Sequence, residues 1–498
     1  MRTTASSRAH LVRRTCGTLP RAVRRAWLLV TLLALGACTV GPDYKRPSYP
    51  TPATFRGDLA PTTEASIGDL VWWRVFEDET LQELIRTTLR ENYDLRVAVA
   101  RILDARAQVT IARSFQFPEV NHRASAIYNR VEGERSPIQP REDFQPLAGI
   151  DLSFELDFWG RFRRSTESAR AELLASDEAR RFVMTTLVSD VASAYFQLRS
   201  LDSELEVSQR TLAARGGSLD LVRQREQGGV AGLIDVRQAE ILVAQAAEAV
   251  VDTQRQIEQT ENAIGVLLGR NPDAIPRGRP LGQQIALPAV PAGVPSALFE
   301  RRADIRQAEA RLHAATARIG VATADFYPRV FLSGAAAGGA LMIDGRWVGP
   351  QALFSIGPSI SLPIFNTGRT QAGVDSAEAR TEEALAQYRQ TIVQAFREVA
   401  DALVEHRRRR EFRVQQEALV IAAGDTARLA DIRYRGGVSS YLEVLDSERQ
   451  FFDAQLGLVR SSRDELLAVV RLYRALGGGW QDEREASARA QPEARREP

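Results

Sequence analysis

The chain has 498 residues, and its 65 Lys+Arg residues nearly balance 63 Asp+Glu residues, which gives a formal net charge of +2. A dedicated nucleic-acid-binding protein carries a concentrated basic excess, so the balanced charge argues against that class. Two cysteines allow at most one disulfide, which excludes a cysteine-stapled scaffold. The four histidines lie far apart in the sequence and form no ligand cluster, so we expect no metal site.

The first 37 residues have the features of a bacterial secretory signal. Residues 1–26 contain several arginines and no acidic residue, and an apolar run extends from Trp27 to Leu35. That run is about half the roughly 20 residues that a membrane-spanning helix needs. Two small residues and Cys38 follow, and they resemble a bacterial lipobox. We therefore predict a lipid on Cys38 as the first mature residue; the alternative is a signal cleaved after a small residue, with Cys38 incidental.

The segment after the lipid, residues 38–78, is predicted to be extended. Thr39 stands where an Asp favours retention in the inner membrane of bacteria, so its presence indicates the outer membrane. No later stretch approaches 18 consecutive apolar residues, and we expect no transmembrane helix in the mature chain. The mature chain is therefore either periplasmic on a lipid tether, or it crosses a membrane as β-strands.

The rest of the chain is an internal repeat. Asp94-Leu95-Arg96 matches Asp304-Ile305-Arg306, and Gly228-Gly229-Val230 matches Gly436-Gly437-Val438, at offsets of 210 and 208 residues. Matches that stay in register over such a length are hard to obtain by chance, so we predict two copies of one unit. The predicted segments are repeat 1 at 79–270, a Pro/Gly-rich linker at 271–295, repeat 2 at 296–478, and a polar, disordered tail at 479–498.

Each copy is predicted to contain a helix, a strand pair, a long helix, a tight turn and a return helix. The first helix of repeat 1 is expected at 79–115, and the long helices at 161–226 and 369–435. Apolar residues in the long helices recur at steps of three, four and seven, which is the pattern of a helix-packing seam. An unbroken helix of that length is about 100 Å long.

Two glycine pairs are expected to turn the chain back after each long helix, at 228–230 and at 436–438. Gly228 and Gly229, like Gly436 and Gly437, permit left-handed backbone angles that end a helix. The return helix predicted at 440–476 is much shorter than the long helix before it. Part of the apolar seam of each long helix is therefore not covered by its return helix, and it must pack against neighbouring hairpins.

Strand pairs are predicted at 119–158 and 329–365. In residues 150–158 apolar side chains alternate with Asp, Ser and Glu, which fits a strand with lipid outside and water inside. A half-buried sheet in a soluble domain shows the same alternation. Four strands are too few for one chain to close a transmembrane barrel, because a single-chain barrel needs at least about eight strands. The open edges of a smaller sheet cannot face lipid. If these strands span a membrane, several chains must share one barrel.

Five motifs are specific when they occur together. They are Val40-Gly41-Pro42-Asp43-Tyr44 with Arg46-Pro47, Trp72-Trp73 with Phe76, Glu300-Arg301-Arg302-Ala303-Asp304-Ile305-Arg306, Tyr434-Arg435-Gly436-Gly437-Val438 before Leu442 and Asp446, and Leu472-Tyr473-Arg474-Ala475-Leu476-Gly477-Gly478-Gly479-Trp480. The set resembles the outer-membrane factor family of TolC-like channels, and within it the lipidated branch that serves RND efflux (NodT-type). The resemblance covers nearly the whole mature chain.

The resemblance implies a mostly α-helical protein that forms a homotrimer, with a 12-stranded transmembrane β-barrel and a long α-helical barrel in the periplasm. Trimeric closure agrees with four strands per chain, although eight strands from a dimer satisfy the same count. Family members dock onto a periplasmic adaptor and an inner-membrane transporter of the RND type. They catalyse no reaction and need no cofactor, so we expect a passive exit duct in the outer membrane without nucleic-acid partners.

The resemblance also places a gate at the periplasmic end, where the hairpin turns meet. Leu442 would form an apolar constriction, and copies of Glu443 and Asp446 would form acidic rings that favour cations. Asp235 follows the first turn, and Tyr434 would help to hold adjacent hairpins closed. The alternative for the acidic residues is an ordinary role at a helix N-terminus, where the helix dipole favours them.

Two other functions stay open at this level. One is a lipid-tethered periplasmic scaffold whose helices bind partners without forming a pore. The other, within the channel class, is a duct for type I protein secretion or for nodulation-signal export, which use the same architecture. An enzyme has no support, because catalytic residues do not cluster and no phosphate-binding loop precedes a helix.

Overall fold

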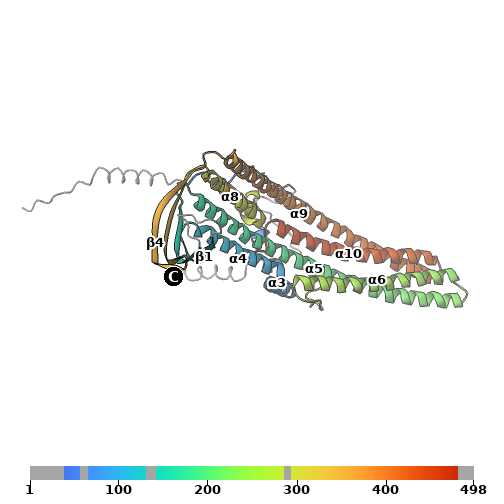
Figure 1. Ribbon diagram of the computed structural model, residues 1–498. Coiled ribbons are helices and arrows are strands. Elements are labelled where there is room, and N and C mark those ends of the chain that lie inside the picture. Colours follow the sequence, from blue (N-terminus) through green and yellow to red (C-terminus); the bar gives the residue numbers. More distant parts are fainter. Residues whose placement is uncertain (1–38, 57–65, 131–141, 285–292, 481–498) are drawn as a thin grey trace, which may run out of the picture. The chain divides into compact units, whose positions relative to one another are not determined.

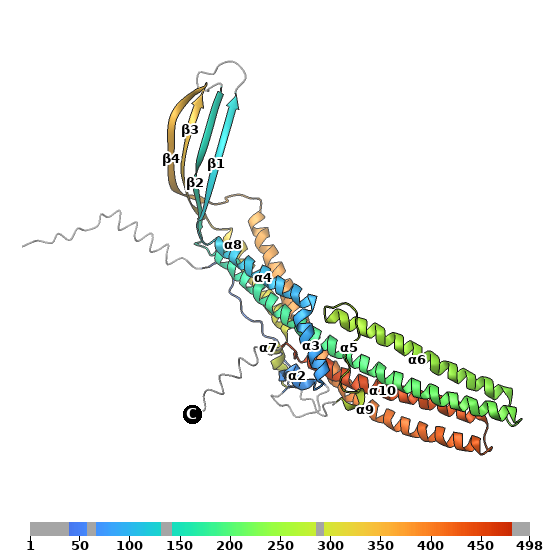
Figure 2. The same cartoon turned by 90° about the horizontal axis from the view of Figure 1, so that it is seen from below.

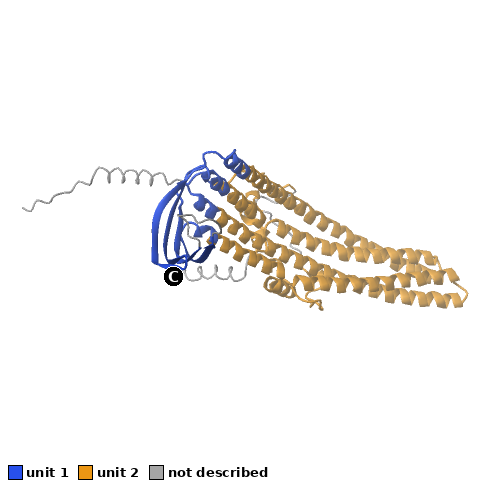
Figure 3. Cartoon of the chain, viewed as in Figure 1, with its two compact units in different colours: residues 1–43, 111–167, 317–377 blue, residues 44–110, 168–316, 378–498 orange. Residues whose placement is uncertain are grey.

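A computed structural model describes residues 39–56, 66–130, 142–284 and 293–480. The predicted signal at 1–37, Cys38, and the tail beyond Trp480 therefore lie outside the described residues. The chain divides into two compact units, which are coloured separately in Figure 3. Among the described residues, no helix combines the length and the apolarity that a membrane crossing requires.

The first unit contains a four-stranded antiparallel sheet with the strand order β1-β2-β3-β4 (Figure 2). Its strands are β1 (Glu119–Arg130), β2 (Glu142–Leu156), β3 (Arg329–Ile343) and β4 (Arg346–Ser361). The prediction of four strands per chain is confirmed, and both strand pairs end a few residues earlier than the sequence pattern indicated. Consecutive strands pair throughout, so among the described residues β1 and β4 each pair on one side only.

The strand register gives the sheet one apolar and one polar face. On the apolar face the side chains stand in cross-strand rows, and these rows are Ile150–Ala336–Phe354, Leu152–Gly334–Ile356, Phe154–Leu332–Pro358 and Leu156–Val330–Ile360. The opposite face is the more polar one: it carries Asp151, Ser153 and Glu155 of β2 with Ser355 and Ser359 of β4, although Leu147, Phe331 and Leu353 also stand on it. Because side chains alternate along a strand, a shift of one residue in any pairing would mix the two faces.

The foot of the sheet holds the start of the described chain within the same unit. Arg164 is almost fully buried and donates to Asp43 at 2.7 Å and to the carbonyl oxygens of Val40 and Gly41. Gly41 has φ +89°, and a Cβ there would lie 2.4 Å from the Cα of Gly320. A larger residue at position 41 would therefore separate this segment from the helix that contains Gly320.

The second unit is built mainly from two helical hairpins (Figure 1). They are α5 (Arg161–Gln227) with α6 (Leu233–Leu267), and α9 (Arg369–Arg435) with α10 (Tyr441–Ala475). The long helices have 67 residues each and the return helices 35 each, so the two copies keep an offset of 208 residues throughout. At 1.5 Å per residue, α5 and α9 are each about 100 Å long.

The largest apolar core lies where both hairpins meet the shorter helices. Its fully buried bulky side chains come from both repeats and from the N-terminal segment, and they include Trp72, Leu81, Ile85, Tyr195, Leu198, Leu298, Ile305, Ile392, Leu472 and Tyr473. Burying one such side chain stabilises the fold by about 1.5–3 kcal/mol. The Trp72-Trp73 motif thus has a packing role, since the rings meet edge to face at 5.2 Å.

The single first helix predicted at 79–115 is wrong in one respect, because it is interrupted at Asn92. The helices α3 (Glu79–Glu91) and α4 (Tyr93–Ser114) meet there, and the side-chain oxygen of Asn92 accepts from the amides of Asp94 and Leu95. This is the geometry of a helix N-cap. In repeat 2 the corresponding break falls at Arg302, between α7 (Leu298–Arg301) and α8 (Ala303–Ala324).

The segment predicted as extended, residues 38–78, is only partly so. Described residues up to position 56 form no helix or strand, but residues 67–69 form a 3₁₀ turn, η1 (Ile67–Asp69). A helical turn, α2 (Trp72–Val75), follows it. The linker predicted at 271–295 contains η2 (Leu281–Gln283) and the first residue of η3 (Pro295–Ala297).

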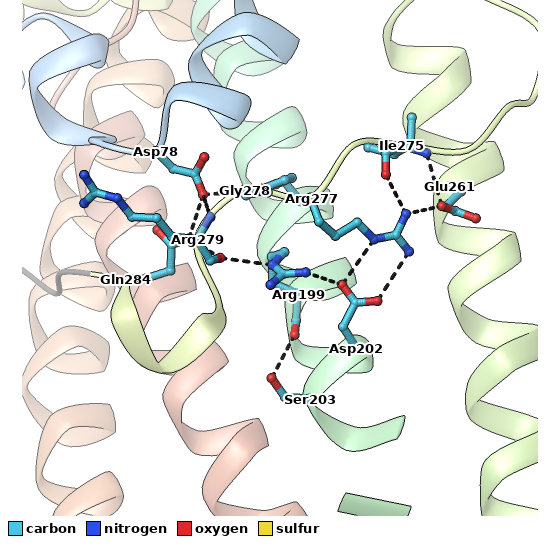
Figure 4. A network of polar contacts seen from close by, with 11 residues as sticks. Asp78, Arg199, Asp202, Ser203, Glu261, Ile275, Arg277, Gly278, Arg279 and Gln284 are labelled. Carbon is cyan, nitrogen blue, oxygen red and sulfur yellow. Dashed lines mark hydrogen bonds and ion pairs between the residues drawn. The ribbon is translucent and has the colours of Figure 1, made fainter. Parts of the chain in front are cut away.

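The linker is attached to the rest of the second unit around Asp78 (Figure 4). One carboxylate oxygen of Asp78 accepts from the Tyr195 hydroxyl at 2.9 Å, the Arg279 amide at 2.9 Å and the Gln284 side chain at 2.8 Å. The other oxygen caps α3 by accepting from the Thr80 amide. Burial alone raises the pKa of Asp78, but the hydrogen bonds outweigh it and the pKa lies below its ordinary value.

Candidate functional site

The two hairpin turns have the same backbone geometry. Gly229 and Gly437 adopt φ +73° and +75°, the left-handed region that side chains other than glycine rarely occupy. In the first turn the amide of Val230 donates to the carbonyl oxygen of Arg225 at 2.9 Å, which closes the last turn of α5 in a Schellman motif. The second turn repeats this bond at 3.0 Å. The glycines therefore fix where each long helix ends.

Below the turns lies a small apolar cluster to which both hairpins contribute, and we call it the tip core. Its buried members are Leu219, Val222, Val236, Ala239, Ala430, Tyr434, Tyr441 and Val444. They come from all four helices of the two hairpins. Separating the hairpins at their ends would expose this cluster to water, so the tip core holds the hairpins together.

Arg225 and Tyr434 form a polar link between the hairpins at the edge of the tip core. The guanidinium group of Arg225 on α5 lies 4.5 Å from the centre of the Tyr434 ring on α9, and it donates to the Tyr434 carbonyl oxygen at 3.1 Å. Tyr434 is only 6% exposed, and its ring packs against Tyr441. Burial raises the pKa of Tyr434, which therefore stays neutral in any periplasmic condition.

A second polar link lies further from the turns. Arg215 on α5 is almost fully buried and donates to the carbonyl oxygen of Leu242, with its guanidinium group 5.1 Å from the centre of the Phe452 ring on α10. Glu448 on α10 accepts from the hydroxyl of Ser218 on α5 at 3.2 Å. Burial lowers the pKa of Arg215 and raises that of Glu448. Moving the hairpins apart would hydrate both charged groups. The recovered hydration offsets the lost contacts, so this link contributes little net free energy to holding the hairpins together.

The predicted gate residues after the second turn lie on the surface of the single chain. Leu442 is 63% exposed and does not belong to the tip core. Glu443 pairs with Arg433 at 3.5 Å, and Asp446 pairs with Arg449 at 3.0 Å. These intrachain arginines reduce the repulsion that rings of acidic side chains would suffer. The proposed constriction and acidic rings stay predictions, because they depend on further copies of the chain.

Asp235, after the first turn, has a local role that the helix N-terminus explains. Its carboxylate accepts from the amide of Gly232 at 3.1 Å, one turn earlier, and so caps α6. Tyr434 is the one predicted gate residue that connects the hairpins within a single chain.

Sequence reasoning missed Arg225, Arg215 and Glu448. Arg225 stands 208 residues before Arg433, yet Arg225 contacts the other hairpin and Arg433 pairs with a neighbouring exposed glutamate. No pattern along the chain distinguishes the two arginines. Arg215 and Glu448 left a weak signal, because each interrupts the apolar spacing of a helix seam.

A sheet with one apolar face and open edges, together with long paired helical hairpins, defines the subunit of an outer-membrane channel of the TolC type. The sequence profile described as "Outer membrane efflux protein" matches residues 84–270 and again 294–478. The chain belongs to this family, and it is an outer-membrane efflux protein that extends into the periplasm.

Relatives and solved structures agree with this placement. The solvent efflux pump outer membrane protein SrpC of Pseudomonas putida is 37% identical over 464 residues, covering 91% of this chain and 97% of the relative. Outer membrane protein OprJ of Pseudomonas aeruginosa is 36% identical, covering 92% and 96%. The outer-membrane channel OprN superimposes with a TM-score of 0.81 at 34% identity, covering 89% of this chain and all of that one. The open state of the Neisseria gonorrhoeae MtrE outer membrane channel superimposes with a TM-score of 0.78 at 30% identity. The match covers 89% of this chain and 99% of that one.

Proposed function

We propose that the chain is the passive exit duct of a tripartite efflux pump, closed at its hairpin turns until partners engage. The observation that carries this proposal is the two-faced sheet: its apolar rows suit lipid and its polar face suits a water-filled lumen. A periplasmic scaffold without a pore would not need a sheet with an exposed apolar face. No catalytic step is assigned to the chain, and the energy for export would come from its partners.

The open edges of the sheet favour assembly from several copies. The edge of β1 in one copy would pair with the edge of β4 in the next, because an unpaired edge cannot face lipid. Two copies would supply eight strands and three copies twelve. We favour the homotrimer, which the family resemblance implies, with the paired hairpins of each copy forming an α-helical barrel.

The names of the relatives indicate which partner proteins the chain would need. SrpC and its relatives are named as outer membrane proteins of efflux pumps for solvents, toluene or antibiotics. We infer a periplasmic adaptor at the hairpin turns and an RND transporter in the inner membrane, with small apolar compounds as cargo. These names favour efflux over type I secretion or nodulation-signal export. Rings of Glu443 and Asp446 would give the closed tip a preference for cations.

Conductance tests the channel directly, and a pair of β4 variants tests the orientation of the sheet. Phe354 is 77% exposed on the apolar face, whereas its neighbour Ser355 belongs to the polar face. Phe354→Arg is expected to cost about 2–4 kcal/mol in the bilayer and to abolish heat-resistant oligomers and conductance. The matched control, Ser355→Arg, should assemble and change only ion selectivity.

Two outcomes would contradict the proposal. If both arginine variants assemble equally well, the apolar face does not contact lipid. If the purified protein never conducts in planar bilayers, even with Asp446→Ala to remove one proposed acidic ring, it is a scaffold and not a duct.

Lipidation is proposed on Cys38, within the motif that resembles a lipobox. Cys38→Ser should abolish incorporation of labelled palmitate, because the thiol is the acceptor of the diacylglycerol group. Acyl chains contribute about 0.8 kcal/mol per buried CH₂. Labelling that persists in the serine variant would show that the lipobox assignment is wrong.

A further inference from the structure

The two hairpins of the sheet have the same strand register once the repeat is taken into account. Val120 stands opposite Leu152 in the first hairpin, and Val330 stands opposite Ile360 in the second. Val330 is the counterpart of Val120 at the offset of 210 residues, and Ile360 is the counterpart of Leu152 at the offset of 208 residues. The repeat therefore reproduces the strands and also the pairs of residues that face each other across them.

The seam between the repeats, where β2 meets β3, has no counterpart within the described part of one chain. There Leu156 stands opposite Val330, and Leu152 stands opposite Gly334. The counterparts of β2 and β3 are β4 and β1, and these two strands are the edges of the sheet (Figure 2). The proposed duct brings β4 of one copy beside β1 of the next, so the missing seam would form there.

A pair of equivalent glycines indicates that β4 approaches another strand as closely as β2 does. A Cβ on Gly149 of β2 would lie 2.5 Å from the carbonyl oxygen of Ala336, so β3 leaves no room for a side chain there. Gly357 of β4 holds the equivalent position, yet nothing lies within 4 Å of a Cβ built on it. The absence of a side chain at Gly357 is explained if β1 of another copy approaches it as β3 approaches Gly149.

The end of β4 is also shorter than its counterpart. β2 continues to Leu156, whose equivalent in repeat 2 is Ile364, but β4 ends at Ser361. Residues 154–156 of β2 pair with β3 and not with β1, so the equivalent residues of β4 lack the strand that would hold them. In the single chain Ile364 is therefore 95% exposed, and Phe365 is 87% exposed.

We infer that β4 of one copy pairs with β1 of the next in the register of β2 with β3, so that Ile360 stands opposite Ala124 of the next copy. The inference rests on the proposed duct and adds the residues that join its copies. Large side chains of β4 then meet smaller ones of β1, as Leu152 meets Gly334 within the chain. The pairs on the apolar face, with β4 first, are Ile364–Val120, Leu362–His122, Ile360–Ala124 and Pro358–Ala126.

Other registers are distinguishable from this one. A shift of one residue would bring the polar side chains of β1 to the apolar face of the sheet, so burial against lipid disfavours it. A shift of two residues keeps the faces separate but breaks the equivalence with the seam between β2 and β3. The experiment therefore has to compare registers that differ by two residues.

Disulfide cross-linking of the full-length protein in isolated outer membranes tests the register. The chain has two cysteines, Cys16 in the predicted signal and Cys38, so introduced cysteines can be assigned without ambiguity. Ala124→Cys combined with Ile360→Cys places two Cβ atoms directly opposite each other, about 4.5–5.5 Å apart, which a disulfide can bridge. Oxidation should convert most of the protein into covalent oligomers, which a reductant should return to monomers.

Two further pairs serve as matched controls. Ala126→Cys combined with Ile360→Cys is shifted by two residues, and such diagonal positions lie about 7–8 Å apart, so it should cross-link at least about tenfold less. Leu152→Cys combined with Gly334→Cys is the equivalent pair within one chain. Its disulfide should form without producing covalent oligomers, which shows that the oxidation reaches this depth of the sheet.

The inferred register is overturned if the shifted pair cross-links better than Ala124→Cys with Ile360→Cys. It is equally overturned if only the control pair within the chain forms a disulfide. Conductance of the reduced variants in planar bilayers separates these outcomes from failure of the proposed duct. A protein that conducts but cross-links in another register is still a duct, whereas one that neither conducts nor forms covalent oligomers contradicts both proposals.

Discussion

Tyr434→Ala is expected to raise the open probability of the channel in planar bilayers at least about tenfold. The ring of Tyr434 is buried in the tip core, where it contacts Tyr441 and the guanidinium group of Arg225. Removing a buried aromatic side chain costs about 3 kcal/mol, and every 1.4 kcal/mol changes an equilibrium tenfold. The substitution destabilises only the closed state, in which the two hairpins are in contact, so the population of the open state increases.

The two repeat-equivalent arginines provide the control for this prediction. Arg225→Ala should increase conductance in the same direction, because it removes the link from α5 to α9. Arg433→Ala removes an exposed side chain whose partner is Glu443, so it restores only part of the repulsion in the proposed acidic ring and should change conductance several-fold less than Arg225→Ala. In a double-mutant cycle, Tyr434→Ala and Arg225→Ala should be non-additive, since they remove one contact. Additive effects, or equal effects of both arginines, would place the closing contact elsewhere.

Much of the fold could be predicted because periodicity and repetition act along the chain. The long helix expected at 161–226 is α5, which ends at Gln227, and the one expected at 369–435 is α9. Apolar spacing determines such helices, and the glycines at positions 229 and 437 determine where they end. The break at Asn92 could also have been recognised, since Asn followed two residues later by Asp is a common helix start.

The contacts within the candidate site could not be predicted in the same way. Arg225 and Arg433 occupy equivalent positions of two helices of equal length, and they differ in what the neighbouring helices bring to them. The repeat is a property of the sequence, but the way its two copies face each other is a property of packing. For the same reason Asp78 had no signal in the sequence, because most of its partners lie more than 100 residues away.

Asp78→Ala is expected to release the linker and to destabilise the second unit by about 3–5 kcal/mol. The substitution removes a helix cap, which is worth about 1 kcal/mol, and leaves the Tyr195 hydroxyl without its acceptor. Tyr195 is 0% exposed, so water cannot replace the lost bond without a rearrangement. Hydrogen exchange of the Gly278 and Arg279 amides measures the release, because these amides donate to Tyr195 and to Asp78.

The exchange of those two amides should become roughly a hundredfold faster in Asp78→Ala, whereas Glu77→Ala should change it less than about threefold. Glu77 precedes Asp78 and carries the same charge, but its side chain is exposed and lies 3.9 Å from Arg279. The pKa of Asp78 in the fold lies below its ordinary value of 3.8, so its charge stabilises the attachment of the linker above that pH. After correction for intrinsic rates, protection should therefore be constant near neutral pH and fall only as the pH drops below about 4. Protection that is lost already between pH 7 and 5 would mean that a histidine, and not this carboxylate, controls the linker.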